Sequence, residues 1–178
     1  MAWRFETRDG KATKVPVNPK TGGNSMANNS STWGTYTQAF QRASSAALAG
    51  VGLQINGAGM IGVDIDYKPH DTMPEAVRAF LEAMPATYTE LSPSGRGVRA
   101  FAFGTLPKGC RHKVVIADGV ELEVYDSGRF LTVTGNAINP APLADLTTFM
   151  ASLEVIKPLE KPRANITPRA SMRATRSS

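Results

Sequence analysis

Apolar and polar residues alternate along much of the chain with the period of two that is typical of β-strands. The alternation and the turn residues that bound it predict strands at 3–7, 51–55, 61–67, 87–90, 98–103, 113–116, 120–125 and 129–134. An extended segment is expected at 14–19 and a loop at 21–32, which is rich in Gly, Asn and Ser. The stretch 56–59, Asn-Gly-Ala-Gly, has the composition of a turn that would join strands 51–55 and 61–67 as a hairpin.

Three segments favour helices instead. Residues 36–48 are rich in alanine and follow Thr35, a candidate N-cap. The run Thr-Met-Pro-Glu at 72–75 has the pattern of a capping box with proline at N1, and it predicts a helix that ends near Met84. A last helix, about 143–156, is expected to pack over the sheet. These elements together indicate an α+β domain with a mainly antiparallel sheet flanked by helices.

Composition allows one domain and a charged tail. The 178 residues, 42% of them hydrophobic, can bury one sizeable core, which we assign to residues 1–156. Residues 157–178 hold six Lys and Arg residues and one Glu, so this tail carries a charge equal to the net +5 of the chain. Its composition predicts disorder, and its charge suits equally a solvated terminus and a phosphate-binding arm.

Cysteine content and hydropathy narrow the class of protein further. A single cysteine, Cys110, excludes an internal disulfide and a zinc site built on several cysteines, and we expect a surface thiol there. The chain shows no signal-peptide pattern and no apolar run near the roughly 18 residues of a membrane span. A cytoplasmic protein with no membrane partner is therefore expected.

Two carboxylates interrupt the apolar strand 61–67, where Asp64 and Asp66 are one residue apart. Alternate residues of a strand share a face, so their Cα atoms lie roughly 6.5 Å apart. That spacing allows both carboxylates to bind hard cations, and their mutual repulsion favours a compensating metal or proton. The other interpretation is the exposed end of an ordinary strand.

Further motifs follow in a fixed order along the chain. They are Lys14 to Pro19, Ser31 to Gly34, the Asp64/Asp66 pair, the turn Ser-Pro-Ser-Gly-Arg-Gly at 92–97, Glu123 to Phe130, and Thr132 to Gly135. The ordered set resembles the N-terminal primase-polymerase domain of phage and plasmid replication proteins, within the archaeo-eukaryotic primase superfamily. The resemblance spans about residues 13 to 136 and implies the catalytic-domain fold of that superfamily.

The resemblance implies template-directed nucleotidyl transfer, as a DNA primase, a DNA polymerase or both, with Mg²⁺ or Mn²⁺. It assigns catalysis and the binding of two metal ions to Asp64, Asp66 and Glu123. Two ions in such sites lie roughly 3.5–4 Å apart and activate the attacking oxygen and the leaving group. Glu121, on the same face of the same predicted strand, is the rival of Glu123.

In the family the second motif usually ends in a histidine that contacts the phosphates of the incoming nucleotide. The corresponding position here is Arg99. Arginine can hold a triphosphate through its planar fork of donors, but it cannot titrate near neutral pH. The candidates for nucleotide binding are Ser94, Arg96, Gly97, Arg99, Arg129 and His112.

The remaining cations are candidates for binding single-stranded template DNA, although such a run is as typical of a solvated surface. They are Lys14, Lys108, Arg111 and Lys113. The other expected partners are nucleoside triphosphates and a separate replicative helicase, because the chain has no P-loop pattern. The alternative is a non-catalytic nucleic-acid-binding protein derived from a primase domain. The intact acidic triad argues against it, and Arg99 argues for it.

Overall fold

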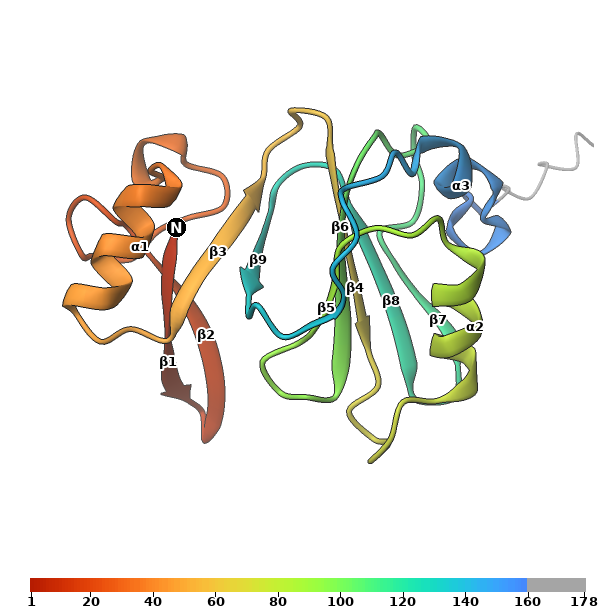
Figure 1. Ribbon diagram of the computed structural model, residues 1–178, viewed down its shortest axis with the longest axis horizontal. Helices are drawn as coiled ribbons and strands as arrows, with labels where there is room; N and C mark the ends of the chain where they lie inside the picture. The colour runs from red at the N-terminus through yellow and green to blue at the C-terminus, as the bar shows by residue number, and fades with distance from the viewer. Residues whose placement is uncertain (160–178) are drawn as a thin grey trace, which may run out of the picture.

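The computed structural model describes residues 1–159 and contains two antiparallel sheets (Figure 1). The four-stranded sheet has the order β2-β1-β3-β9, with bounds Ala2–Arg8 (β1), Lys11–Val17 (β2), Gly50–Ile55 (β3) and Arg129–Val133 (β9). The six-stranded sheet has the order β10-β5-β6-β4-β8-β7. Its bounds are Met60–Asp66 (β4), Thr89–Leu91 (β5), Gly97–Phe103 (β6), Lys113–Ala117 (β7), Val120–Tyr125 (β8) and Ala137–Asn139 (β10). This mixture of antiparallel sheets and few helices is compatible with a primase-like domain, but the strands form two sheets rather than one.

Short helices cover these sheets. Helix α1 (Tyr36–Ser45) packs on the four-stranded sheet, whereas α2 (Glu75–Ala83) and α3 (Thr147–Ser152) lie on one face of the six-stranded sheet (Figure 1). Two 3₁₀ turns complete the elements, η1 (Ser30–Thr32) and η2 (Glu154–Ile156). The main core lies under α2 and α3, where fully buried residues of β4, β6 and β8 such as Ile65 and Leu122 meet Val77 and Met150. Within the described part of the chain, no helix is long and apolar enough to cross a bilayer.

Strand β9 lies across the opposite face of the six-stranded sheet. Leu131 of β9 packs there against Ile55 and Phe101. Gly62 of β4 marks the closest approach, because a Cβ at this position would overlap the Leu131 side chain and lie 3.3 Å from Ile55 Cγ1. Strand β9 therefore forms a wall over this face of the sheet.

The predicted hairpin of 51–55 and 61–67 is wrong. Strand β3 pairs with β1 and β9, while β4 pairs with β6 and β8 in the other sheet. The connection does reverse the chain, but its Gly57 N–H donates to the Asp126 carbonyl, which belongs to the β8–β9 connection. A turn-forming composition specifies a change of direction, and long-range packing decides which strands pair.

The helix predictions had mixed outcomes. The Thr35 cap is confirmed, since its hydroxyl accepts from the Gln38 N–H and the Gln38 side chain accepts in return from the Thr35 N–H. That helix ends at Ser45, before the predicted limit. The capping box at 72–75 is wrong, because Pro74 itself is the N-cap and no side chain caps α2. The last helix comprises only the six residues of α3 and the turn η2.

Further differences concern the first hairpin, strand β10 and the single cysteine. Strands β1 and β2 form a long hairpin through Asp9 and Gly10, both with positive φ, and β10 was not predicted. Cys110 is buried, so the predicted surface thiol is wrong, and burial raises the pKa of the thiol. The predicted tail, 157–178, lies outside the described residues from position 160 onward.

Candidate active site

A row of charged side chains crosses the six-stranded sheet on the face that β9 covers. The strand register places Glu90 of β5, Arg99 of β6, Asp64 of β4, Glu123 of β8 and Lys113 of β7 opposite one another in turn. Directly opposed residues of antiparallel strands have Cβ atoms about 4.5–5.5 Å apart, so each can contact the next. Residues far apart in sequence thus form one line across five strands.

A second row lies two residues further along β4. Asp66 is opposite Gly97 on one side and Glu121 on the other. Within these rows, the adjacent strands β4 and β8 bring four carboxylates, Asp64, Asp66, Glu121 and Glu123, onto one face of the sheet. They line a cavity of about 330 Å³ between the sheet and β9, together with Lys14, Lys68, Ser92, Ser94, Gly97, Arg99, Lys113, Arg129, Thr132 and neighbouring backbone. The shared face of Asp64 and Asp66, predicted from strand alternation, is what the structure shows.

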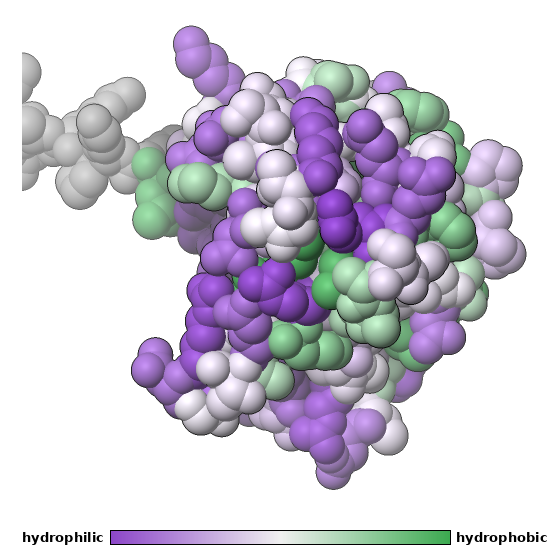
Figure 2. Space-filling view, turned by 90° about the vertical axis from the view of Figure 1, so that its left-hand side faces the viewer, coloured by the Kyte–Doolittle hydropathy of each residue, from purple (hydrophilic) through white to green (hydrophobic). Residues whose placement is uncertain are grey.

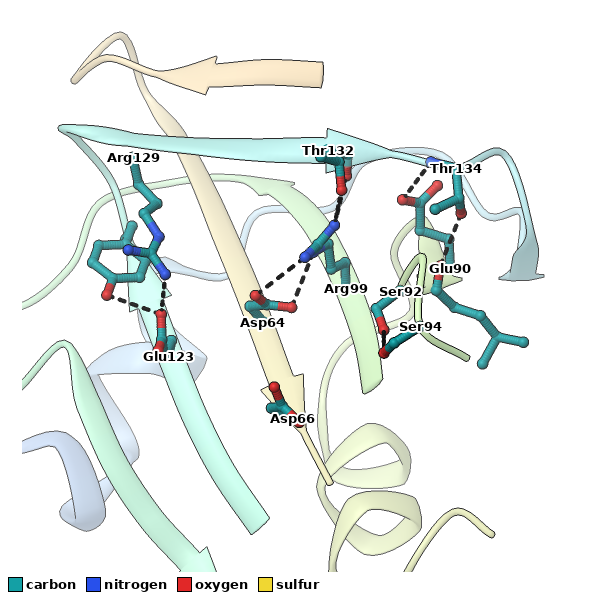
Figure 3. Close-up of polar contacts among 12 residues, drawn as sticks. Asp64, Asp66, Glu90, Ser92, Ser94, Arg99, Glu123, Arg129, Thr132 and Thr134 are labelled. Atoms are coloured by element: carbon teal, nitrogen blue, oxygen red, sulfur yellow. Dashed lines mark hydrogen bonds and ion pairs between the residues drawn. The ribbon is translucent and has the colours of Figure 1, made fainter. Parts of the chain in front are cut away.

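Arg99 is buried between Asp64 and β9 (Figure 3). Its Nε donates to Asp64 Oδ1 at 3.0 Å, and its Nη1 donates to the Thr132 carbonyl at 3.0 Å and to the Thr132 hydroxyl. The side chains of Arg99 and Asp64 are only 6% and 19% exposed. Arg99 is therefore the counterion of Asp64 and ties that carboxylate to the wall of the cavity.

Glu123 contacts two cations and a phenol. Arg129 Nη2 lies 2.5 Å from Glu123 Oε2, which also accepts from the Tyr125 hydroxyl at 3.0 Å. Lys113 Nζ lies 3.3 Å from Glu123 Oε1 and 2.7 Å from Glu121 Oε2. Hydrogen bonds from Lys113 to Glu121 and Glu123 raise the pKa of that ammonium group. The two neighbouring glutamates therefore share one lysine, but only Glu123 is also held by Arg129.

The donor chemistry of these carboxylates fits Mg²⁺ or Mn²⁺, which prefer hard oxygen ligands. Asp66 forms an ion pair with Lys68, so each member of the predicted metal-binding triad is engaged by a side-chain cation. Among residues 1–159, no three Asp, Glu, His or Cys side chains converge on one metal position. Metal binding by Asp64, Asp66 and Glu123 would require these ion pairs to open.

Lys14, predicted as a nucleic-acid contact, reaches this cavity from β2. Burial lowers the pKa of its ammonium group, and the charge of Arg99 lowers it further. A partly desolvated ammonium group that faces the carboxylates of the cavity is suited to binding a phosphate that enters beside it.

The predicted nucleotide-binding residues divide into two groups. Ser94 and Gly97 lie at the cavity with Arg99 and Arg129, and the Ser94 hydroxyl is 3.0 Å from that of Ser92. Arg96 turns away and donates to Asp71 at 2.8 Å. The remaining candidate, His112, is not among the residues that line the cavity. It stacks on Tyr125 with ring centroids 5.4 Å apart, and its Nδ1 lies 2.9 Å from the Val124 carbonyl oxygen.

The predicted basic run also separates. Lys113 lines the cavity, as described. Arg111 instead donates to the carbonyls of Val155 and Lys157 and so holds the segment after α3. Lys108 lies in the exposed loop between β6 and β7, outside the residues that line the cavity.

Sequence reasoning missed several residues of the site. Tyr125 could have been found, because it continues the alternation of Glu121 and Glu123 along β8. Lys68 follows Asp66 but carries no local signal of its role. Thr132 reaches the site because β9 crosses the sheet, a tertiary arrangement that local sequence does not encode.

A buried carboxylate fixes the end of β9. Glu90 is fully buried and accepts from the N–H groups of Thr134 and Gly135 at 2.9 and 3.0 Å (Figure 3). The Tyr88 hydroxyl donates to the same carboxylate at 2.9 Å, and burial together with this contact raises the pKa of Tyr88 to about 12. Glu90 therefore holds the wall of the cavity from its C-terminal end.

Comparison with known proteins gives one informative match. No protein-family model matches the chain. The chain is similar to the DNA primase-polymerase of Nitratiruptor phage NrS-1, with 32% identity over 143 residues, which is 78% of this chain. The match covers 19% of the length of that phage protein. The similarity supports a primase-polymerase family for this part of the chain.

Proposed function

We propose that this chain is a template-directed nucleotidyltransferase, the primase-polymerase domain of a phage or plasmid-type replication protein of the archaeo-eukaryotic primase superfamily. The observation that carries the proposal is the cavity beneath β9, where four carboxylates from two adjacent strands meet five cationic side chains. Metal-assisted transfer to a polyanionic substrate needs both kinds of group. Similarity to a DNA primase-polymerase over most of the chain supports the same assignment.

In the proposed reaction, a 3′ hydroxyl oxygen forms a bond to the α-phosphorus of a nucleoside triphosphate, and the bond to pyrophosphate breaks. Two Mg²⁺ or Mn²⁺ ions, when bound, activate the hydroxyl and neutralise the triphosphate. Asp64, Asp66 and Glu123 would hold them. The partners of this reaction are single-stranded DNA template and nucleoside triphosphates, and a helicase would be a separate protein or lie outside this chain.

The other side chains of the cavity bind and position. Lys14 and Arg129 present positive charge to the triphosphate from β2 and β9. Gly97, at the foot of the 92–97 turn, lets the turn pack closely against β4, because a Cβ there would lie 2.8 Å from the Ile65 carbonyl oxygen and 2.9 Å from Ser92 Oγ. Before metal binds, Arg99 orients Asp64 through their ion pair and so acts as a positioning residue.

One observation favours the non-catalytic alternative, a nucleic-acid-binding protein derived from a primase domain. Asp64, Asp66 and Glu123 are each engaged by a cation of the chain itself. If these pairs persist in solution with metal present, the cavity would bind phosphates without transferring nucleotides.

A synthesis assay with a matched pair of variants tests the proposal. Wild-type protein should extend a primer or make one de novo only with template and with Mg²⁺ or Mn²⁺. Glu123→Gln should reduce the rate about a thousandfold or more, since several kcal/mol of transition-state stabilisation depends on the metal ligands. Glu121→Gln is the control, because it lies on the same strand face and shares Lys113.

The results of this assay distinguish the catalytic proposal from the non-catalytic alternative, and Glu123 from Glu121. Template binding without synthesis by the wild type would establish the non-catalytic alternative. Loss of synthesis in Glu121→Gln with near-normal rates in Glu123→Gln would transfer the metal-binding role to the rival carboxylate.

A further inference from the structure

A second hollow adjoins the candidate active site at the turn that precedes β6. It has a volume of about 930 Å³ and lies between α1, the start of β3, the turn 92–95 and the segment 133–136. Ser92 and Ser94 line both this hollow and the active-site cavity, so the two spaces are adjacent. The described residues that line the hollow are aromatic, aliphatic, hydroxyl-bearing or glycine, with Asn136 the single amide and no charged side chain.

Two aromatic rings stand open at this hollow. Tyr36 and Phe40 lie one helical turn apart on α1, with ring centroids 5.9 Å apart and planes inclined by 26°. They are 71% and 53% exposed, whereas Ala43, one turn further along the same side of α1, is buried where the helix packs on its sheet. The flat apolar faces of this stacked, solvent-exposed pair have no role in the fold of the described residues.

A buried hydrogen-bond donor also lies at this hollow. Trp3 is 4% exposed, and its Nε1–H has no hydrogen-bond partner among the described residues. The indole nitrogen can only donate, and a buried donor left unpaired is costly. Gly50 lies close to this group, since a Cβ there would be 3.2 Å from Trp3 Nε1. An acceptor supplied by a ligand in the hollow would satisfy this group.

We propose that this hollow binds single-stranded nucleic acid, with successive bases stacked on Tyr36 and Phe40 and an acceptor of the strand at Trp3 Nε1. Base stacking on aromatic side chains tolerates any sequence, which suits a strand that must be copied. The inference rests on the proposed function, because the strand would continue from the hollow into the cavity past Ser92 and Ser94. The cations of that cavity, rather than the hollow itself, would meet its phosphates.

The surface around α1 favours a strand over a protein partner. Figure 2 shows this side of the molecule, where apolar residues occur in small patches among hydrophilic ones. Stable protein interfaces of the obligate kind need broader apolar surfaces. A position next to the candidate active site is a property that a substrate strand requires and that a docked protein does not.

The test measures the Kd of a fluorescein-labelled oligothymidylate by anisotropy. Removing both rings in Tyr36→Ala/Phe40→Ala should weaken binding by about tenfold or more per ring. Tyr36→Trp/Phe40→Trp should retain affinity, while Tyr36→Leu/Phe40→Leu should behave like the alanine variant, because leucine keeps apolar volume without a stacking face. Phe103→Ala is the control, since Phe103 is 50% exposed and lies outside the hollow.

Salt dependence adds a second readout. Stacking releases no counterions, so the slope of log Kd against log salt should be unchanged in Tyr36→Ala/Phe40→Ala. Lys14→Ala, by contrast, should lower the slope by about 0.7, the value for one phosphate contact to a single strand. Thermal melting of every variant establishes that the folded protein is being compared.

Each outcome bears on one proposal. Unchanged oligothymidylate affinity in the double alanine variant, with a wild type that synthesises DNA, overturns the stacking site and leaves the proposed function intact. Weakened binding in that variant, with a wild type that makes no product, supports the stacking site and refutes catalysis. Wild-type affinity in the leucine variant, or a changed oligomeric state in the alanine variant, assigns the rings to apolar contact or to a second copy and overturns the inference.

Discussion

Neighbouring residues of β8 belong to two very different environments. Leu122 is fully buried beneath α2 and α3, whereas Glu123 faces the cavity, bound to Arg129 and Lys113. The same division holds along β4, where Ile65 lies in the core between Asp64 and Asp66. One face of the sheet gains stability from apolar burial, and the other carries charges whose desolvation must be compensated by partners. Residues that stabilise the fold and residues that line the cavity are thus immediate neighbours along a strand.

The largest expected effect comes from the apolar face. Leu122→Ala should lower the free energy of unfolding by about 2–5 kcal/mol, since the side chain is fully buried and leaves a cavity. Urea denaturation measures the loss. The rate of synthesis per folded molecule should stay within a fewfold of wild type, whereas Glu123→Gln should show the reverse pattern. A fall in the rate of folded Leu122→Ala comparable to that of Glu123→Gln would show that the two faces are coupled.

An effect of intermediate size on stability is expected at Asp64, where the charged face of the sheet is itself buried. Asp64→Asn should lower the free energy of unfolding by roughly 2–4 kcal/mol, because Arg99 loses its counterion. This is somewhat less than the cost of breaking a fully buried ion pair. Asp64→Asn/Arg99→Met should recover part of that loss. Asp66→Asn, whose pair with Lys68 is exposed, should change stability by less than about 1 kcal/mol. Equal melting temperatures for the two single variants would mean that Arg99 does not depend on Asp64.

The smallest effect should come from Lys14, whose pKa burial lowers. A lysine whose pKa is lowered by folding reduces the free energy of unfolding. The reduction has its full size when the pH is below the pKa of the folded state. That penalty is relieved as pH rises toward the unfolded value of about 10.4. Lys14→Met should therefore be slightly more stable than wild type at neutral pH, with the advantage shrinking as the pH rises through the lowered pKa of Lys14. It should also bind triphosphate and DNA less well. A stability difference that grows with alkaline pH would refute the assigned sign.

Local signals predicted most of the elements and missed how they pair. Alternation located the strands of the main sheet, and Thr35 located the start of α1. The Asp9-Gly10 turn, a strong short-range hairpin signal, was available in the sequence and was overlooked. The hairpin expected from 56–59 failed because β3 finds its second partner in β9, much later in the chain. That choice depends on packing between the sheets, which no window of residues contains.

The candidate site, too, could be predicted only where the signal is local in the sequence. Asp64, Asp66 and Glu123 could be nominated because alternation and motif order are one-dimensional properties. The pairing of Arg99 with Asp64 and Thr132 could not, since it requires β6, β4 and β9 to meet. Arg96 was predicted from the motif at 92–97 and Arg111 from the basic run, and each has a different partner in the fold.

The crossing of β9 over Gly62 has a consequence for the history of this protein. A side chain at position 62 and a large side chain at position 131 compete for one space, so neither position can change alone without moving β9. In related sequences we therefore expect the two positions to covary, with an alanine at 62 accompanied by a smaller residue at 131. Divergence at two uncharged sites would then tune the width of the cavity, while the charged residues that we propose bind metal and phosphate stay the same.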